Sequence, residues 1–197
     1  MKDDYAGIAP IYSRLSRLVF GSTLDQANRW FLEGTGAKSV LIIGGGDGSA
    51  YVDMAGALRG EFWEKSPAML RLAKNNLAKS ALSFHSGDFE SRIKADFILL
   101  PFVLDTLTDL EMEKMLLQLR AHLNPGGKLG LSDFFPAKGL FQKAVFWAMI
   151  LFFRIFTAHS RRDLPDYGRY LARAGYRLQE EKIWRKGWIR AQAWVLD

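Results

Sequence analysis

The sequence lacks cysteine entirely and has only three histidines among its 197 residues. Without cysteine the chain has no disulfide framework, no thiolate zinc site and no cysteine nucleophile. A site built on a metal is not expected either, because no cluster of ligating residues stands out. The absence of cysteine fits an intracellular setting, so we expect a cytoplasmic protein.

Long hydrophobic runs are also missing. The first eleven residues include Lys2, Asp3, Asp4 and Pro10 and do not resemble a signal peptide. The longest apolar run, 144–153, is flanked by Lys143 and Arg154 and is shorter than the ~20 residues that a membrane-spanning helix needs. We therefore expect no transmembrane segment.

Acidic residues are outnumbered, which gives a formal charge of +6. The excess of arginine and lysine lies mainly in the last quarter of the chain, and no nucleic-acid-binding motif accompanies it. We interpret it as a solvated basic surface and expect no nucleic-acid partner.

What the sequence does contain is an alternation of strand and helix patterns that fits one domain over 1–197. Helical spacing at 8–20 and 24–32 predicts two leading helices within 1–36. Strands are then predicted at 39–43, 60–63, 82–85, 96–100 and 128–133, with helical segments at 49–58, 68–79 and 109–123 between them. The helix at 109–123 should begin with a capping box from Thr108 to Glu111.

The end of the chain departs from this alternation. Two strand-like runs, 176–184 and 188–196, are joined by only three residues, which requires an antiparallel hairpin. The sequence thus predicts an α/β fold: a doubly wound, mostly parallel sheet that ends in an antiparallel β-hairpin. In such a sheet a ligand binds beyond the carboxyl ends of the strands.

Four motifs lie at those strand ends. Residues 40–48 are a strand followed by Gly44-Gly45-Gly46-Asp47-Gly48, and residues 62–70 are a strand that ends in Glu64-Lys65 before a helix. Gly87-Asp88-Phe89 follows the third strand. The fourth motif combines 95–107, which includes Pro101 and Phe102, with the Asn124-Pro125-Gly126-Gly127 turn.

In this order and spacing, the motifs resemble the class I S-adenosylmethionine-dependent methyltransferases, in the broad group of ubiquinone- and menaquinone-type enzymes. The resemblance implies a seven-stranded-type sheet that binds S-adenosylmethionine. It implies that Glu64 accepts hydrogen bonds from the ribose hydroxyls, that Asp88 and Phe89 contact the adenine, and that the glycine loop approaches the methionine and ribose portions. The cofactor-binding positions that it implies are Gly44, Gly45, Gly46, Asp47, Gly48, Glu64, Lys65, Asp88, Phe89, Pro101 and Phe102.

Catalytic residues are less well marked. Asp105 and Thr106 occupy the positions where related enzymes often have histidines or other polar residues facing the transferred methyl group. Asp105 is our candidate for a catalytic residue. An equal alternative is that Asp105 only helps to start the next helix. Tyr12, on the leading helix, is a second candidate, and core packing is the alternative for it.

Residues 140–156 predict a helix that is apolar around nearly its whole circumference. It lies in a segment, 137–160, where the resemblance places cap elements over the acceptor. We expect a lid for a small, apolar or aromatic acceptor; a homodimer interface and peripheral membrane contact are the alternatives.

Two other functions stay open. The chain could bind S-adenosylmethionine without turnover. It could also be an NAD(P)-binding oxidoreductase of the Rossmann type, because Glu64 lies at a suitable distance after the glycine loop. Ser49 at the third glycine position of that fingerprint and the terminal hairpin argue against the oxidoreductase.

Overall fold

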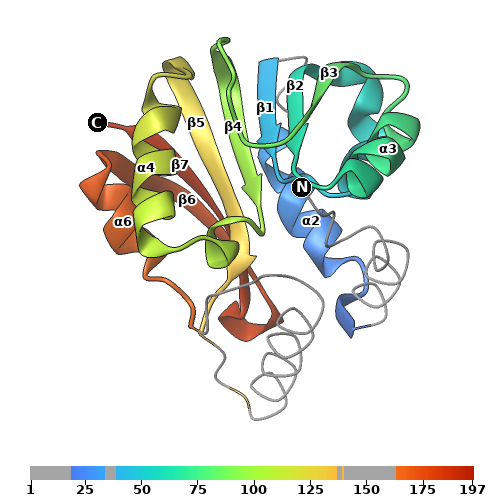
Figure 1. Ribbon diagram of the computed structural model, residues 1–197. Coiled ribbons are helices and arrows are strands. Elements are labelled where there is room, and N and C mark those ends of the chain that lie inside the picture. The colour runs from blue at the N-terminus through green and yellow to red at the C-terminus, as the bar shows by residue number, and fades with distance from the viewer. Residues whose placement is uncertain (1–18, 34–38, 137–138, 140–162) are drawn as a thin grey trace.

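The computed structural model describes residues 19–33, 39–136, 139 and 163–197. Within these residues seven strands form one sheet in the order β3-β2-β1-β4-β5-β7-β6 (Figure 1). The strands are β1 (Ser39–Ile43), β2 (Arg59–Glu64), β3 (Ala81–Ser86), β4 (Ala95–Pro101), β5 (Leu123–Phe134), β6 (Tyr176–Trp184) and β7 (Ile189–Leu196). The pairings among β1 to β5 are parallel, whereas β7 is antiparallel to both β5 and β6. The predicted doubly wound sheet with a terminal hairpin is confirmed.

The central strands are buried on both faces, which explains their nearly continuous apolar sequences. In β1, Val40 and Ile42 pack into one cluster, and Leu41 and Ile43 pack into the other. This alternation follows from the two-residue repeat of a strand, so one short run supplies two cores.

Helical segments cover both faces of the sheet. The first face carries α2 (Thr23–Arg29), the 3₁₀ segments η1 (Trp30–Leu32) and η2 (Ser49–Ala57), and α3 (Pro67–Asn76). The second carries α4 (Asp109–Arg120) and α6 (Tyr167–Arg173) (Figure 1), and buried side chains of both helices belong to one cluster. Short 3₁₀ segments η3 (Leu104–Thr106) and η4 (Arg185–Gly187) follow β4 and β6.

The helix starts follow the local chemistry of the sequence. The Ser66 side chain accepts a hydrogen bond from the Met69 N–H at the start of α3, and Pro67 occupies its first turn. The predicted capping box of α4 is present: the Thr108 hydroxyl accepts from the Glu111 N–H, and the Glu111 carboxylate accepts from the Thr108 N–H.

Two segments differ from the sequence prediction. The helical pattern after the glycine loop forms the 3₁₀ segment η2, in which Gly56 disfavours a regular α-helix. Strand β5 begins at Leu123 and not at Lys128, and its register shifts between the pairs Ala95–Leu123 and Phe97–Lys128. The predicted Asn-Pro-Gly-Gly turn is therefore an irregularity inside β5, because Pro125 has no N–H to donate to the ladder.

The predicted first leading helix falls almost wholly outside the described residues, and so does the cap segment 137–160 apart from Gly139. The second leading helix corresponds to α2 and η1. Among the described residues, no helix has the length and apolar character needed to cross a bilayer.

Candidate functional site

The glycine loop connects β1 to η2 through a tight turn at the carboxyl edge of the sheet. Its turn is closed by a hydrogen bond from the Gly48 N–H to the Gly45 carbonyl oxygen, 3.1 Å long. Gly44, Gly46 and Gly48 all have φ between 61° and 72°. These left-handed conformations are strained for residues with a Cβ atom, which explains the glycine content.

The glycines differ in what surrounds them. A Cβ atom at Gly48 would lie 2.8 Å from Leu77 Cδ1, and one at Gly44 would collide with the Val103 side chain. Among the described residues, no atom lies within 4 Å of a Cβ atom placed at Gly46. The described part of the chain thus packs against the loop at both ends and leaves its middle glycine, Gly46, uncovered.

The carboxylate of Glu64, at the end of β2, is held against this loop. Its Oε2 accepts a hydrogen bond from the Gly46 N–H at 3.0 Å, and its Oε1 accepts one from the Ser66 N–H at 2.9 Å. Two backbone donors thus fix the orientation of the carboxylate, which is only partly buried. These two donors use two of the roughly four hydrogen bonds that a carboxylate can accept.

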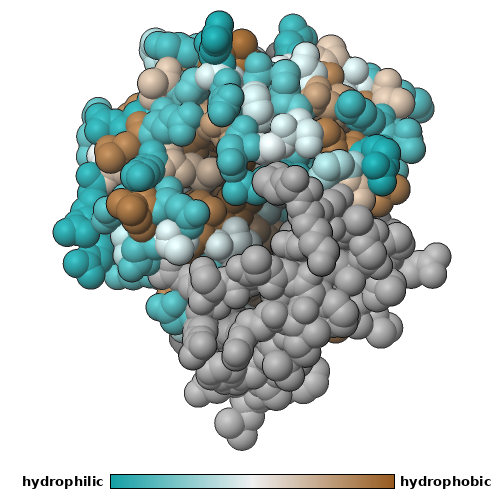
Figure 2. Space-filling model, viewed as in Figure 1, coloured by the Kyte–Doolittle hydropathy of each residue, from teal (hydrophilic) through white to brown (hydrophobic). Residues whose placement is uncertain are grey.

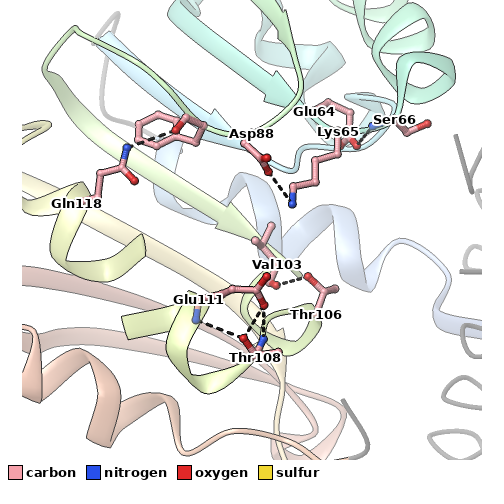
Figure 3. A network of polar contacts seen from close by, with 10 residues as sticks. Glu64, Lys65, Ser66, Asp88, Val103, Thr106, Thr108, Glu111 and Gln118 are labelled. Atoms are coloured by element: carbon pink, nitrogen blue, oxygen red, sulfur yellow. Dashed lines mark hydrogen bonds and ion pairs between the residues drawn. The ribbon is translucent and has the colours of Figure 1, made fainter. Parts of the chain in front are cut away.

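Lys65 and Asp88 form an ion pair across the ends of β2 and β3, with Nζ and Oδ1 2.7 Å apart. Both side chains are mainly exposed. Glu111, at the start of α4, has a lowered pKa. The main cause is that its carboxylate accepts hydrogen bonds from Thr108, and the positive charge of Lys65 lowers the pKa by a smaller amount. Figure 3 shows Lys65 extending from β2 toward this end of α4.

Phe89 is buried, unlike its neighbour Asp88. Its ring packs edge-to-face on Trp63 and on His122, with centroid distances of 5.7 and 5.1 Å. Contact between Phe89 and an adenine ring stays a prediction, because in this structure the ring belongs to the core. Apolar side chains are visible between α4 and the β2–β3 end of the sheet, with hydrophilic residues around them (Figure 2).

The end of β4 faces the glycine loop. Pro101 is buried, and Phe102 has a positive φ of 55°, which is rare for a residue with a bulky side chain. The Phe102 N–H donates to the Ser132 carbonyl oxygen at 2.8 Å, and its ring packs on Phe134 with centroids 4.9 Å apart. These contacts hold the strained backbone and place Val103 next to Gly44.

Asp105, the sequence-predicted catalytic candidate, lies in η3 directly after β4. Its N–H donates to Oδ2 of Asp133 at 3.4 Å. Asp133 lies near the end of β5 and has no exposed surface. Asp133 was not among the site residues predicted from the sequence. Its signal there is an acidic residue at the end of an apolar strand, the same pattern that marked Glu64.

Not all of the predicted site residues can be placed. Asp47 lies in the glycine loop, where its Oδ1 accepts from the Ser49 N–H. Tyr12 lies outside the described residues. In the described part of the chain, no group of three or more acidic or histidine side chains is arranged to hold a metal ion.

Comparison with solved structures identifies the architecture. The mitomycin 7-O-methyltransferase MmcR matches with a TM-score of 0.73 and 19% identity over 100% of this chain and 61% of that one. A TehB-like SAM-dependent methyltransferase from Corynebacterium glutamicum matches with a TM-score of 0.67 and 12% identity, over 97% and 99% of the two chains. This chain has the class I methyltransferase fold.

A third match, DhpI, was solved as a complex with SAH and has a TM-score of 0.71 and 16% identity, over 96% of this chain and 92% of DhpI. The chain spans less than two-thirds of the length of MmcR. No protein-family model matches the sequence, and no curated protein sequence matches it.

Proposed function

We propose that this protein is an S-adenosylmethionine-dependent methyltransferase that acts on a small, apolar or aromatic acceptor. The observation that carries the proposal is the Glu64 carboxylate, which the Gly46 and Ser66 N–H groups orient beside Gly46, a loop position that the described residues leave uncovered. A carboxylate fixed at the end of β2 is suited to accept hydrogen bonds from a ribose diol.

The residues around the loop fit the cofactor. Gly46 leaves space for close approach, and Val103 lies against Gly44 at the border of the site. Asp88 offers a carboxylate acceptor for an exocyclic amine, and the aliphatic stem of Lys65 offers an apolar surface. We infer that Gly44 to Gly48 hold the methionine and ribose portions of S-adenosylmethionine. Its remaining portion would be bordered by Asp88, Lys65, Pro101 and Phe102.

The fold supports this reading. The proteins named above are methyltransferases or, for DhpI, bind SAH. Strand β7 lies between β5 and β6 and is antiparallel to both. Dinucleotide-binding domains have a different strand order, which disfavours the alternative of an NAD(P)-dependent oxidoreductase.

The acceptor class is inferred from aromatic side chains near the ends of β4, β5 and η4. Phe134 packs against Phe102, Phe20 and Trp188, with centroid distances between 4.9 and 5.6 Å. An acceptor with an apolar or aromatic body could extend this cluster. For the segment 137–160 we propose a lid over the acceptor, with a homodimer interface and peripheral membrane contact as the alternatives. A role for Tyr12, the ubiquinone- and menaquinone-type subgroup and a cytoplasmic location stay predictions.

The bound cofactor would supply a methyl group on a sulfonium centre. The chain's own part is to orient the acceptor in line with that group and to exclude water. The packed aromatic cluster can exclude water, and the strained turn at Phe102 fixes the segment that faces the loop.

Titration calorimetry with S-adenosylhomocysteine (SAH) and, separately, with NADH tests the cofactor assignment. We expect binding of SAH and none of NADH; the reverse would refute the proposal. A product assay with radiolabelled S-adenosylmethionine and a panel of phenols and quinones then tests turnover. Binding without any product across the panel would favour the alternative of a protein that binds the cofactor without turnover.

A further inference from the structure

Lys65 and Asp88 lie side by side because of the way β2 and β3 pair. Glu64, the last residue of β2, is the register partner of Ser86 in β3. The Gly87 N–H then donates to the Glu64 carbonyl oxygen at 3.2 Å, so the contact between the two segments continues past the end of β3. Lys65 follows Glu64 directly, and Asp88 follows Gly87. The two side chains therefore leave neighbouring strand ends at the carboxyl edge of the sheet.

These two side chains form an ion pair that solvent can reach. Lys65 Nζ and Asp88 Oδ1 are 2.7 Å apart, and the side chains point toward one another (Figure 3). The exposed fraction is 64% for the Lys65 side chain and 75% for that of Asp88. An exposed ion pair contributes little to folding stability. A ligand that approaches this edge of the sheet can contact both charged groups.

The acidic residue at the start of α4 belongs to a different set of contacts. Glu111 Oε2 accepts hydrogen bonds from the Thr108 N–H at 2.8 Å and from the Thr108 hydroxyl at 2.6 Å. Glu111 thus caps its own helix, and Asp88 is the carboxylate in direct contact with the Lys65 ammonium. The pair places one anionic acceptor immediately beside one cationic donor.

The pair lies where the base of a bound nucleoside would extend. In the proposed function the Glu64 carboxylate holds the ribose diol, and the base of a nucleoside is bonded directly to that sugar. Lys65 is the residue after Glu64, and Asp88 is at the end of the adjacent strand. A base attached to a sugar on Glu64 can therefore reach both side chains.

The hydrogen-bonding edge of adenine complements such a pair. Its exocyclic amine donates hydrogen bonds, and the ring nitrogens on either side of the amine accept them. An ionised aspartate only accepts, and a lysine ammonium only donates. Hypoxanthine has a carbonyl oxygen in place of the amine, and a carboxylate facing that oxygen would repel it.

We propose that Lys65 and Asp88 recognise the base of the cofactor as a unit. Asp88 accepts from the exocyclic amine, and the Lys65 ammonium donates to the ring nitrogen beside that amine. Asp88 Oδ1 stays on Lys65 Nζ while Oδ2 meets the amine, so Lys65 also orients the carboxylate. The inference rests on the proposed function and deepens it, because it makes Lys65 a specificity-determining residue for adenine.

Deletion of single ring nitrogens tests the role of Lys65. Titration calorimetry compares SAH with two analogues in which a CH group replaces N1 or N7 of the adenine. The wild type should bind one of these analogues roughly 3- to 10-fold more weakly than SAH, as expected for one hydrogen bond at an exposed site. Lys65→Met keeps an apolar stem without the charge. It should bind SAH more weakly by a similar factor and should bind that analogue as tightly as SAH, whereas Lys65→Arg should restore part of the difference.

Deletion of the amine tests the role of Asp88. S-inosylhomocysteine carries a carbonyl oxygen in place of the exocyclic amine of SAH, and the wild type should prefer SAH. Asp88→Asn introduces an NH₂ group that can donate to that oxygen, so the preference for SAH over the inosine compound should narrow. An unchanged preference would contradict the assignment of Asp88 to the amine.

Lys114→Met is the matched control, because it makes the same change at an exposed position on α4. It should leave the affinities for SAH and its analogues unchanged. Thermal unfolding followed by circular dichroism should give the wild-type midpoint for Lys65→Met as well, since a surface ion pair contributes little to stability. A weaker affinity of Lys65→Met is then a property of the site and not of the fold.

The failure of this inference can be distinguished from the failure of the proposed function. If the wild type binds SAH but binds both ring-nitrogen analogues equally well, only the role of Lys65 is overturned. The same holds if Lys65→Met keeps the wild-type ratios among the three compounds. If the wild type binds neither SAH nor any of its analogues, the proposed function is refuted, and this inference is refuted with it.

Discussion

Replacement of Glu64 by glutamine tests the cofactor site with the smallest change in shape. The wild-type carboxylate accepts from two backbone donors, Gly46 N–H and Ser66 N–H. A glutamine amide has one oxygen and one NH₂ group, so only one of these donors keeps an acceptor and the other faces a second donor. The variant therefore loses the negative charge and one loop contact, while its volume is almost unchanged.

The magnitude follows from these contacts. A hydrogen bond to a charged group contributes about 1.5–3 kcal/mol, so loss of one such bond to a ribose hydroxyl should weaken SAH binding roughly 10- to 100-fold. Loss of the contact to the glycine loop should cost about 1 kcal/mol of stability, which corresponds to a thermal midpoint about 2–4 °C lower for a chain of this size.

Titration calorimetry with SAH measures the first effect, and thermal unfolding followed by circular dichroism measures the second. Glu113→Gln is the matched control: this glutamate lies on α4, partly exposed, in an ion pair with Arg173. It should change neither quantity appreciably, because surface ion pairs contribute little. If Glu64→Gln binds SAH as tightly as the wild type, the assignment of this carboxylate to the ribose is wrong.

Three further predictions concern stability. Since burial raises the pKa of Asp133, the folded chain keeps a proton on this residue that the unfolded chain loses above about pH 4. The free energy of unfolding should therefore fall by about 1.4 kcal/mol per pH unit between about pH 4 and the raised pKa. Urea unfolding at several pH values should show this slope, and Asp133→Asn should remove it. Gly48→Ala should destabilise the fold by about 1–2 kcal/mol, because Gly48 has a positive φ and its added Cβ atom would contact Leu77. Gly56→Ala, where no described residue lies within 4 Å of the added Cβ atom, should not, and equal urea midpoints for the two variants would contradict this. Thr108→Ala removes the cap of α4 and should cost about 1 kcal/mol in the same assay; Thr108→Ser should restore most of it.

Much of the fold was predictable because local patterns and tertiary structure agree. The apolar run 96–100 indicated a buried strand, and the structure has β4 at Ala95–Pro101. The capping box at Thr108 and the three-residue connection at 185–187 were explicit in the sequence, and both are confirmed. Each depends on residues only a few positions apart, so a single sequence is enough to reveal it.

The candidate site was predictable only where a motif lies on one continuous segment. The glycine loop and Glu64 belong to such motifs, and the structure brings them into contact. The approach of Asp133 to Asp105 depends on the pairing of β4 with β5, which no local pattern encodes. The burial of Phe89 likewise depends on Trp63 and on α4, so its exposure could not be judged from its neighbours in sequence.

The position of β7 has a consequence for how the molecule is assembled. Strand β6 pairs with β7 alone, and β5 has β7 as its outer neighbour, so β6 has no place in the sheet until residues 189–196 are available. During synthesis the outer edge of β5 and the whole of β6 therefore stay unpaired until β7, which is made after both, is available. An unpaired edge of this kind can recruit strands from other chains. Release from the ribosome before residue 189 should thus yield aggregates and not a smaller folded protein.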